Sequence, residues 1–209
     1  MGEVRNTNHQ KQHLLFIGAH PDDADIEAGG TAIKFLESGH QVTYIAMTNG
    51  NAGHHKMGRD ALAKRRFEET QRVAKFLGLT YIVRDTPDTE LIPSLENRWD
   101  LIRLIRNIKP TIIVTHRLND YHADHRATSL LVQDAAYLVA VPHVCPDSPP
   151  LDYNPVILFH QDDFRKPYPF DPSIIVDISD VINKKMEALA CHESQVFEWL
   201  PWIEGDTRP

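Results

Sequence analysis

The chain has 209 residues, of which 42% are hydrophobic, and a formal net charge of −7 at pH 7. This length and hydrophobic content suit one domain with a sizeable core, and the acidic balance argues against a nucleic-acid partner. No apolar stretch is long enough to span a bilayer, and the two cysteines form neither a disulfide framework nor a metal-like spacing. We therefore expect a cytoplasmic protein with no membrane segment, folded as a single domain over residues 1–209 with a polar N-terminal extension at 1–13.

Strands and helices alternate in the predicted structure. The apolar run at 14–19 is typical of a buried parallel strand, and the apolar positions at 26–38 have helical spacing until Gly39 ends the pattern. Further strands are predicted over residues 41–47, 80–83, 111–115, 156–160 and 173–178, and further helices over 58–77, 95–108, 126–139 and 181–199. This alternation implies βαβ crossovers, so we expect an α/β, Rossmann-like domain with a mainly parallel sheet flanked by helices on both faces.

Two polar segments directly follow predicted strands. The first is GAHPDDADIEAGG at 18–30, and the second is THRLNDYHADHR at 115–126, after the fourth strand. Ligands bind such sheets at the carboxyl ends of the strands, beside the point where the strand order reverses. If the sheet has the order 3-2-1-4, the two segments face each other, and two carboxylates and two or three imidazoles converge.

The carboxylates crowded into the first segment indicate a bound cation. Like charges repel one another, and burying them without compensation is costly, whereas a divalent cation removes that cost. Two histidines and one aspartate are a common catalytic zinc set, which leaves an open position for water. Helix capping is the competing explanation, and it accounts for one aspartate more readily than for three beside a histidine and a proline.

The two motifs together carry a family resemblance. His-Pro-Asp-Asp at 20–23 and His-Ala-Asp-His at 122–125 resemble the PIG-L/LmbE-like family of zinc-dependent N-deacetylases, and the resemblance runs over most of the chain. It implies an LmbE-like fold and a hydrolase that removes the acetyl group from an N-acetylglucosamine-type sugar or conjugate. One departure is Asp25, which stands where the family pattern usually has Glu.

The resemblance also implies the metal ligands and the base. His20, Asp23 and His125 would bind one Zn²⁺ ion per chain, or another divalent transition metal. Asp22 would be the general base for a water whose pKa zinc brings to about 7.

Two further catalytic roles follow from the second motif. His122 would stabilise the oxyanion, and Asp124 would orient His122 and support its protonated form. Either Asp22 or His122 would protonate the leaving amine, and the sequence leaves this choice open.

Substrate contacts are expected from residues near the second predicted strand and the helix after it. Arg66 matches a family arginine whose fixed charge would suit an anionic aglycone, although Arg59 and Arg65 are rivals. Thr48 and Asn49 lie where the strand ends, so they would also face the substrate. The partners implied are a small-molecule amino sugar and, by family analogy, other copies of the chain in a trimer or hexamer.

Other histidines and the C-terminal aromatic residues are expected to be structural. Nothing in the sequence places His116 or His160 on the metal. Trp199 and its apolar neighbours are expected in the core or at a subunit interface rather than against a sugar.

Two other function classes remain open at this point. One is a different metal-dependent hydrolase such as a phosphoesterase, which often uses two metals, and the other is a non-catalytic module that binds a sugar or nucleotide. The phosphate-binding G-x-G-x-x-G pattern is absent after the first strand, which argues against a nucleotide-binding module. Asp22 is not needed to bind the metal, so its presence favours catalysis over binding. The aglycone is also open, with malate, inositol and a chito-oligosaccharide as the alternatives.

Overall fold

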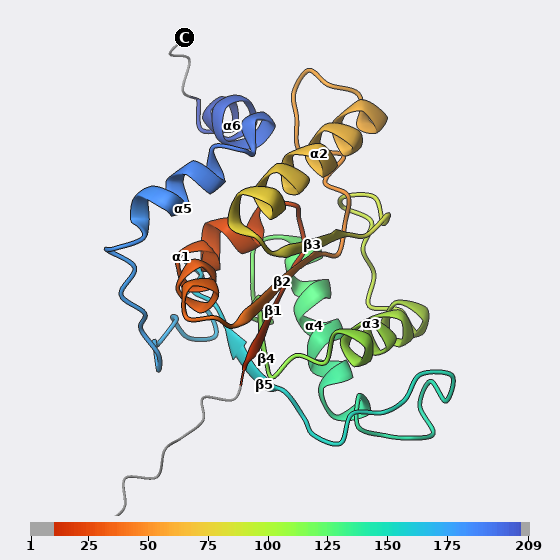
Figure 1. Cartoon of the computed structure of the whole chain (residues 1–209). Coiled ribbons are helices and arrows are strands. Elements are labelled where there is room, and N and C mark those ends of the chain that lie inside the picture. Colours follow the sequence, from red (N-terminus) through yellow and green to blue (C-terminus); the bar gives the residue numbers. More distant parts are fainter. Residues whose placement is uncertain (1–10, 206–209) are drawn as a thin grey trace, which may run out of the picture.

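Five parallel strands form the centre of the molecule, as the computed structural model of the chain shows (Figure 1). The structure describes residues 11–205, so most of the predicted polar extension lies outside the described residues. The strands are β1 (His13–Gly18), β2 (Gln41–Ala46), β3 (Thr80–Val83), β4 (Ile112–Thr115) and β5 (Val156–Phe159). Their order in the sheet is β3-β2-β1-β4-β5, which confirms the predicted reversal between β1 and β4.

Helices cover both faces of the sheet (Figure 1). On one face lie α1 (Asp23–Glu37), α2 (Arg59–Leu77) and α5 (Ile182–Leu189), and on the other lie α3 (Leu95–Ile108) and α4 (Ala123–Leu138). Successive residues of a strand point to opposite faces, so Leu14 and Phe16 join one core and Leu15 and Ile17 the other. No helix among the described residues has the length and apolar character needed to cross a membrane.

Two of these helices begin earlier than the sequence pattern predicts. Helix α1 starts at Asp23 rather than at residue 26, and α4 starts at Ala123 rather than at 126. The polar first turns hid these starts, because apolar periodicity begins only after them. Both polar motifs therefore lie at a helix N-terminus.

Two predictions for the C-terminal region are wrong. Residues 173–178 form no strand, and three of their apolar side chains are exposed by 41% to 82% because this segment lies outside the sheet ladder. The predicted helix at 181–199 is broken, since α5 ends at Leu189 and a π-helical segment, Ser194–Trp199, leads into α6 (Leu200–Ile203). Buried polar contacts hold the break, as His192 Nε2 lies 2.8 Å from the Asp25 carboxylate.

The parallel register brings three loops to one edge of the sheet. Ile17 of β1 pairs with Thr115 of β4, and Gly18 pairs with Ala46 of β2, so the chain leaves all three strands at the same level. The Thr115 hydroxyl donates to the Ile17 carbonyl at 2.8 Å. A Cβ atom at Gly18 would lie 2.8 Å from the Cβ of Asp23, so glycine allows the close approach of the first motif to its own strand.

Candidate metal centre and active site

The three predicted metal ligands converge at this edge. His20 Nδ1 lies 3.2 Å from His125 Nε2 and 3.7 Å from Asp23 Oδ2, and His125 Nε2 lies 3.7 Å from Asp23 Oδ1. Two ligand atoms bound to one tetrahedral zinc would be about 3.3 Å apart, given metal–ligand bonds of about 2.0 Å. All three residues are at most 9% exposed. The pair His20 Nδ1 and His125 Nε2 and the pair His125 Nε2 and Asp23 Oδ1 are therefore spaced as ligands of one metal ion, whereas the 3.7 Å contact of His20 is with the other Asp23 oxygen, Oδ2.

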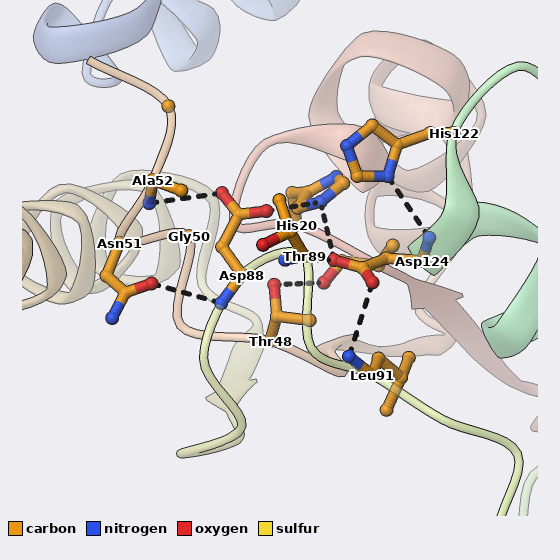
Figure 2. Close-up of polar contacts among 12 residues, drawn as sticks. His20, Thr48, Gly50, Asn51, Ala52, Asp88, Thr89, Leu91, His122 and Asp124 are labelled. Carbon is orange, nitrogen blue, oxygen red and sulfur yellow. Dashed lines mark hydrogen bonds and ion pairs between the residues drawn. The ribbon is translucent and has the colours of Figure 1, made fainter. Parts of the chain in front are cut away.

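The carboxylates behind the two histidines support this assignment. His20 Nε2 lies 3.3 Å from Asp88 and 3.4 Å from Asp124, and His125 Nδ1 lies 3.0 Å from Asp120. Figure 2 shows His20 between Asp88 and Asp124. Ionised carboxylates accept only, so His125 Nδ1 carries a hydrogen and its Nε2 turns a lone pair toward His20 Nδ1, while the two carboxylates beside His20 Nε2 favour a positive charge on that ring. Either a proton on His20 Nδ1 or a metal ion between the two rings satisfies that lone pair, and carboxylates of this kind also support the histidines of zinc sites.

The same contacts shift the pKa values of the side chains. Burial opposes the imidazolium of His20, but hydrogen bonds to Asp124, Asp23 and Asp88 outweigh it and raise the pKa of His20 well above 6.5. Burial raises the pKa of Asp88, but the contacts with His20 and Arg66 outweigh it and lower the pKa to about 2. The carboxylates are thus ionised at neutral pH, and the centre favours a positive charge.

Asp23 is held by one oxygen and presents the other to the centre. Its Oδ2 atom accepts the backbone N–H groups of Ala19 and His20, each at 2.8 Å, and lies 3.1 Å from His116 Nε2. Its Oδ1 atom faces His125. Burial raises the pKa of Asp23, but the neighbouring imidazoles of His125, His116 and His20 hold it well below 3.8.

Asp22 borders the cavity in front of the cluster. It is the N-cap residue of α1 but makes no side-chain capping bond, so capping does not explain its presence. Its Oδ1 atom lies 2.8 Å from Nη2 of Arg66, which is only 2% exposed. Arg66 Nη1 also donates to the Gly50 carbonyl at 3.1 Å, and glycine there, with φ of +66°, leaves room for the guanidinium. The Arg66 charge is therefore paired with Asp22.

The structure corrects the expected contact between Asp124 and His122. The Asp124 carboxylate accepts the backbone N–H groups of Thr89 at 2.7 Å and Leu91 at 3.3 Å and supports His20 (Figure 2). It is the backbone N–H of Asp124 that binds His122, donating to its Nδ1 at 3.1 Å. The neutral His122 ring, whose pKa burial lowers, then carries its hydrogen on Nε2.

Two of the predicted substrate contacts lie away from the cavity. Thr48 is fully buried and its hydroxyl donates to a backbone carbonyl at the end of β1 (Figure 2), while Asn49 lines a separate depression. Among the three candidate arginines, only Arg66 lines the cavity; Arg59 and Arg65 are engaged by the carboxylates of Glu90 and Glu198. The position of Thr48 and Asn49 after a strand correctly predicts that they lie at this edge of the sheet, but it does not predict the direction in which their side chains point.

The cavity itself has a volume of about 340 Å³. Its floor is the cluster, and part of its wall is apolar, formed by Ile26, Tyr121, Trp199, Leu200 and Ile203. Trp199, which the sequence was expected to place in the core or at a subunit interface, therefore lines this cavity. A cavity of this size accommodates a small ligand.

Sequence reasoning also missed two carboxylates of the centre. Asp88 lies in the loop after β3, and Asp120 lies five residues before His125. The signal available for Asp88 was its position after a strand of the same sheet, and for Asp120 its place within the second motif.

Comparison with known proteins agrees with this geometry. A family model described as "PIG-L: GlcNAc-PI de-N-acetylase" matches residues 15–136, more than half of the chain. The chain belongs to the PIG-L family. Diacetylchitobiose deacetylase of Thermococcus kodakarensis is 33% identical over 205 residues, a match that covers 91% of this chain and 74% of that protein.

The proteins that this chain resembles have more than one named activity. The N,N'-diacetylchitobiose deacetylase of Pyrococcus horikoshii has a TM-score of 0.82 at 28% identity, with 97% of this chain and 78% of that chain covered. The 4-oxalmesaconate hydratase of Pseudomonas putida is 25% identical over 93% of this chain and 78% of its own length. The reaction must therefore be argued from the site as well as from the family.

Proposed function

We propose that the chain is a zinc-dependent hydrolase that removes the acetyl group from an N-acetylglucosamine-type sugar or conjugate. N-deacetylation of such conjugates is the activity supported by the family and by the relatives named as deacetylases. The observation that carries the metal dependence is the approach of His20 Nδ1 to His125 Nε2 at 3.2 Å and of His125 Nε2 to Asp23 Oδ1 at 3.7 Å, with carboxylates behind both imidazoles.

Zinc held by these three side chains would polarise the acetamide carbonyl and activate a water molecule. Asp22 takes the proton of the attacking water, because its carboxylate borders the cavity next to the cluster and Arg66 holds one of its oxygens. His122 donates from Nε2 to the oxyanion that forms, since its Nδ1 is occupied by the Asp124 N–H. Asp22, once protonated, or a protonated His122 delivers the proton that the leaving amine requires.

The charges of the cavity favour an uncharged aglycone. Arg66 is the one Arg or Lys side chain among the residues that line the described cavity, and Asp22 already pairs with it. A carboxylate on the aglycone would find no free cation and would face Asp88. Trp199 and Ile203 instead offer an apolar surface to a sugar ring. We therefore favour an inositol or chito-oligosaccharide substrate over a malate conjugate.

A panel of substrates tests this function. Free-amine release would be followed with N,N'-diacetylchitobiose, an N-acetylglucosaminyl inositol and N-acetylglucosaminyl malate, each with and without removal of the metal by a chelator. We expect release from the neutral substrates, loss of release after chelation and recovery with added zinc. Release from none of them, together with hydration of 4-oxalmesaconate, would contradict the proposal and favour the reaction named for the P. putida relative.

Compartment and assembly remain predictions. The cytoplasmic location is tested by fractionating the source cells, and the trimer or hexamer by the mass of the purified protein in solution. The exposed apolar side chains of Ile174, Ile175 and Val176 are consistent with a covered surface in an assembly.

A further inference from the structure

The loop after β3 contains a residue whose backbone conformation is unfavourable for its side chain. Thr89 has a φ of +72°, in the left-handed region that glycine adopts freely and that side chains branched at Cβ strongly disfavour. Two other non-glycine residues of the described chain have a positive φ, but neither is branched at Cβ. They are Lys109, at the C-terminus of α3, and Cys145, in a loop whose carbonyls bind Arg106. Thr89 therefore carries a conformational cost that glycine would avoid.

Backbone hydrogen bonds hold this conformation. The N–H of Asp88 donates to Asn51 Oδ1 at 3.1 Å (Figure 2), and the Asp88 carbonyl accepts from Arg59 Nη2 at 3.1 Å. The Thr89 N–H donates to Asp124 Oδ2 at 2.7 Å. Strained backbone of this kind persists only where its surroundings fix it, and it is concentrated at functional sites. These contacts explain how the conformation is maintained, but none of them uses the threonine side chain.

The Thr89 side chain lies at the cavity. Thr89 is exposed, and it lines the cavity together with Asp88 and His20. Within the part of the chain that the structure describes, its hydroxyl forms no hydrogen bond. A threonine hydroxyl is both a donor and an acceptor, so it complements a hydroxyl group of a sugar. An internal partner thus does not account for the threonine, whereas a ligand in the cavity does.

We propose that Thr89 is a substrate-binding residue, whose strained backbone directs its hydroxyl to a hydroxyl group of the bound sugar. The side chain that costs stability thereby contributes to substrate affinity. This inference rests on the proposed function, because the sugar is the substrate class proposed above. It requires that stability rises and substrate affinity falls when glycine replaces Thr89, a trade-off typical of functional residues.

Three substitutions separate the hydroxyl from the backbone strain. Thr89→Val keeps the branched shape and the strain but removes the hydroxyl. Thr89→Ser keeps the hydroxyl with less crowding at Cβ, and Thr89→Gly removes both the hydroxyl and the strain. Thr80→Gly is the control, because Thr80 is an exposed residue of β3 without a positive φ, and glycine in a strand lowers stability.

The first measurement is thermal unfolding of the metal-free protein. We expect Thr89→Gly to unfold about 2–4 °C above the wild type, whereas Thr80→Gly should unfold below it. An unfolding temperature of Thr89→Gly at or below that of the wild type would overturn the strain on which the proposal is built. Because neither substrate nor metal enters this measurement, its result is independent of the proposed zinc function.

The second measurement is kinetic, with N,N'-diacetylchitobiose as the substrate. We expect KM to rise about 3- to 10-fold in Thr89→Val and Thr89→Gly, the range of one neutral hydrogen bond, and to stay within about twofold in Thr89→Ser. We expect kcat to change by less than about twofold, because a contact present in both the bound substrate and the transition state does not alter the chemical step.

Three outcomes decide the contact. A wild-type KM in Thr89→Val, or an equal rise of KM in Thr89→Ser, would overturn the proposal. If Thr89→Val does not fold, Thr89→Gly and Thr89→Ser make the same comparison. Wild-type protein that is inactive on every substrate of the panel would contradict the proposed function and with it this contact, whereas the unfolding result would stand.

Discussion

The two walls of the cavity differ in how they are held. On the inner wall, His20, Asp23 and His125 are nearly buried, and each makes at least two polar contacts with neighbouring residues. On the outer wall, Trp199 and Ile203 belong to short helical segments, and Ile203 is 58% exposed. The inner wall therefore has the fixed geometry that the proposed catalysis requires, and we propose that the less buried outer wall contacts the rest of the substrate.

The outer wall is attached at a few points. Gln195 Nε2 donates to the Gly53 carbonyl at 3.1 Å, and the Glu198 carboxylate accepts from Arg65 and lies 2.9 Å from His54 Nε2. Because Glu198 is partly exposed, these ion pairs contribute little stability. We therefore expect changes on the inner wall to abolish the reaction and changes on the outer wall to alter substrate preference.

Asp22→Asn should have the largest effect. Removing a general base typically slows the chemical step by about 10²- to 10⁴-fold. Zinc content should be unchanged, because Asp22 is not among the converging ligands. The measurement is kcat with a neutral substrate alongside metal analysis, and a kcat within threefold of the wild type would exclude Asp22 as the base.

Asp120→Ala should weaken metal binding on the inner wall. Asp120 holds His125 Nδ1 at 3.0 Å, so its loss frees the ring to rotate. We expect zinc affinity to fall by about 10- to 100-fold in a chelator competition. Asp147→Ala, at an exposed carboxylate, is the control, and equal affinity of the two variants would contradict the role of Asp120.

Trp199→Ala should change the outer wall alone. We expect KM for the preferred conjugate to rise about tenfold with kcat nearly unchanged, because the lost contact acts on substrate and transition state alike. Phe197→Ala removes a nearby aromatic ring that is 61% exposed and does not line the cavity, so it should leave both constants unaltered. A fall in kcat for Trp199→Ala would show that the two walls are not separable.

Glu198→Gln should have the smallest effect, and it depends on pH. The hydrogen bond from Arg65 lowers the pKa of Glu198 from 4.5 to about 2. A lowered pKa stabilises the folded state above pH 4.5, and this contribution disappears as the pH falls from 4.5 to about 2. At pH 7 the variant should lose about 1 kcal/mol or less in urea unfolding. A difference that grows on acidification would contradict this assignment.

The features of the structure that depend on local residue patterns and on motif spacing were predicted from the sequence. The strand order and the convergence of His20, Asp23 and His125 follow from alternation and from two motifs at strand ends. Asp88 is a single carboxylate in a loop, and its role depends on a tertiary contact with His20, which no local pattern reports. The contact of His160 Nε2 with His116 Nδ1 at 2.9 Å joins residues 44 positions apart, and no local pattern reports it either.

The apolar residues at 173–178 show that a local pattern can also give a wrong prediction. Their β-branched residues predict a strand, but a local pattern does not show whether a neighbouring strand is available to pair with it. The segment lies exposed outside the sheet. The prediction of one continuous helix over residues 181–199 is wrong for a similar reason. Buried contacts of His192 with α1 and of Ser194 with α2 interrupt the helix, although the apolar residues have helical spacing.

Metal content is the most direct test of the centre. Wild-type protein and His125→Ala would be purified, supplied with zinc, freed of excess metal and analysed for zinc per chain. We predict about one tightly bound zinc per wild-type chain, and its loss in His125→Ala together with amine release. Wild-type protein that holds no zinc after this treatment would contradict the account.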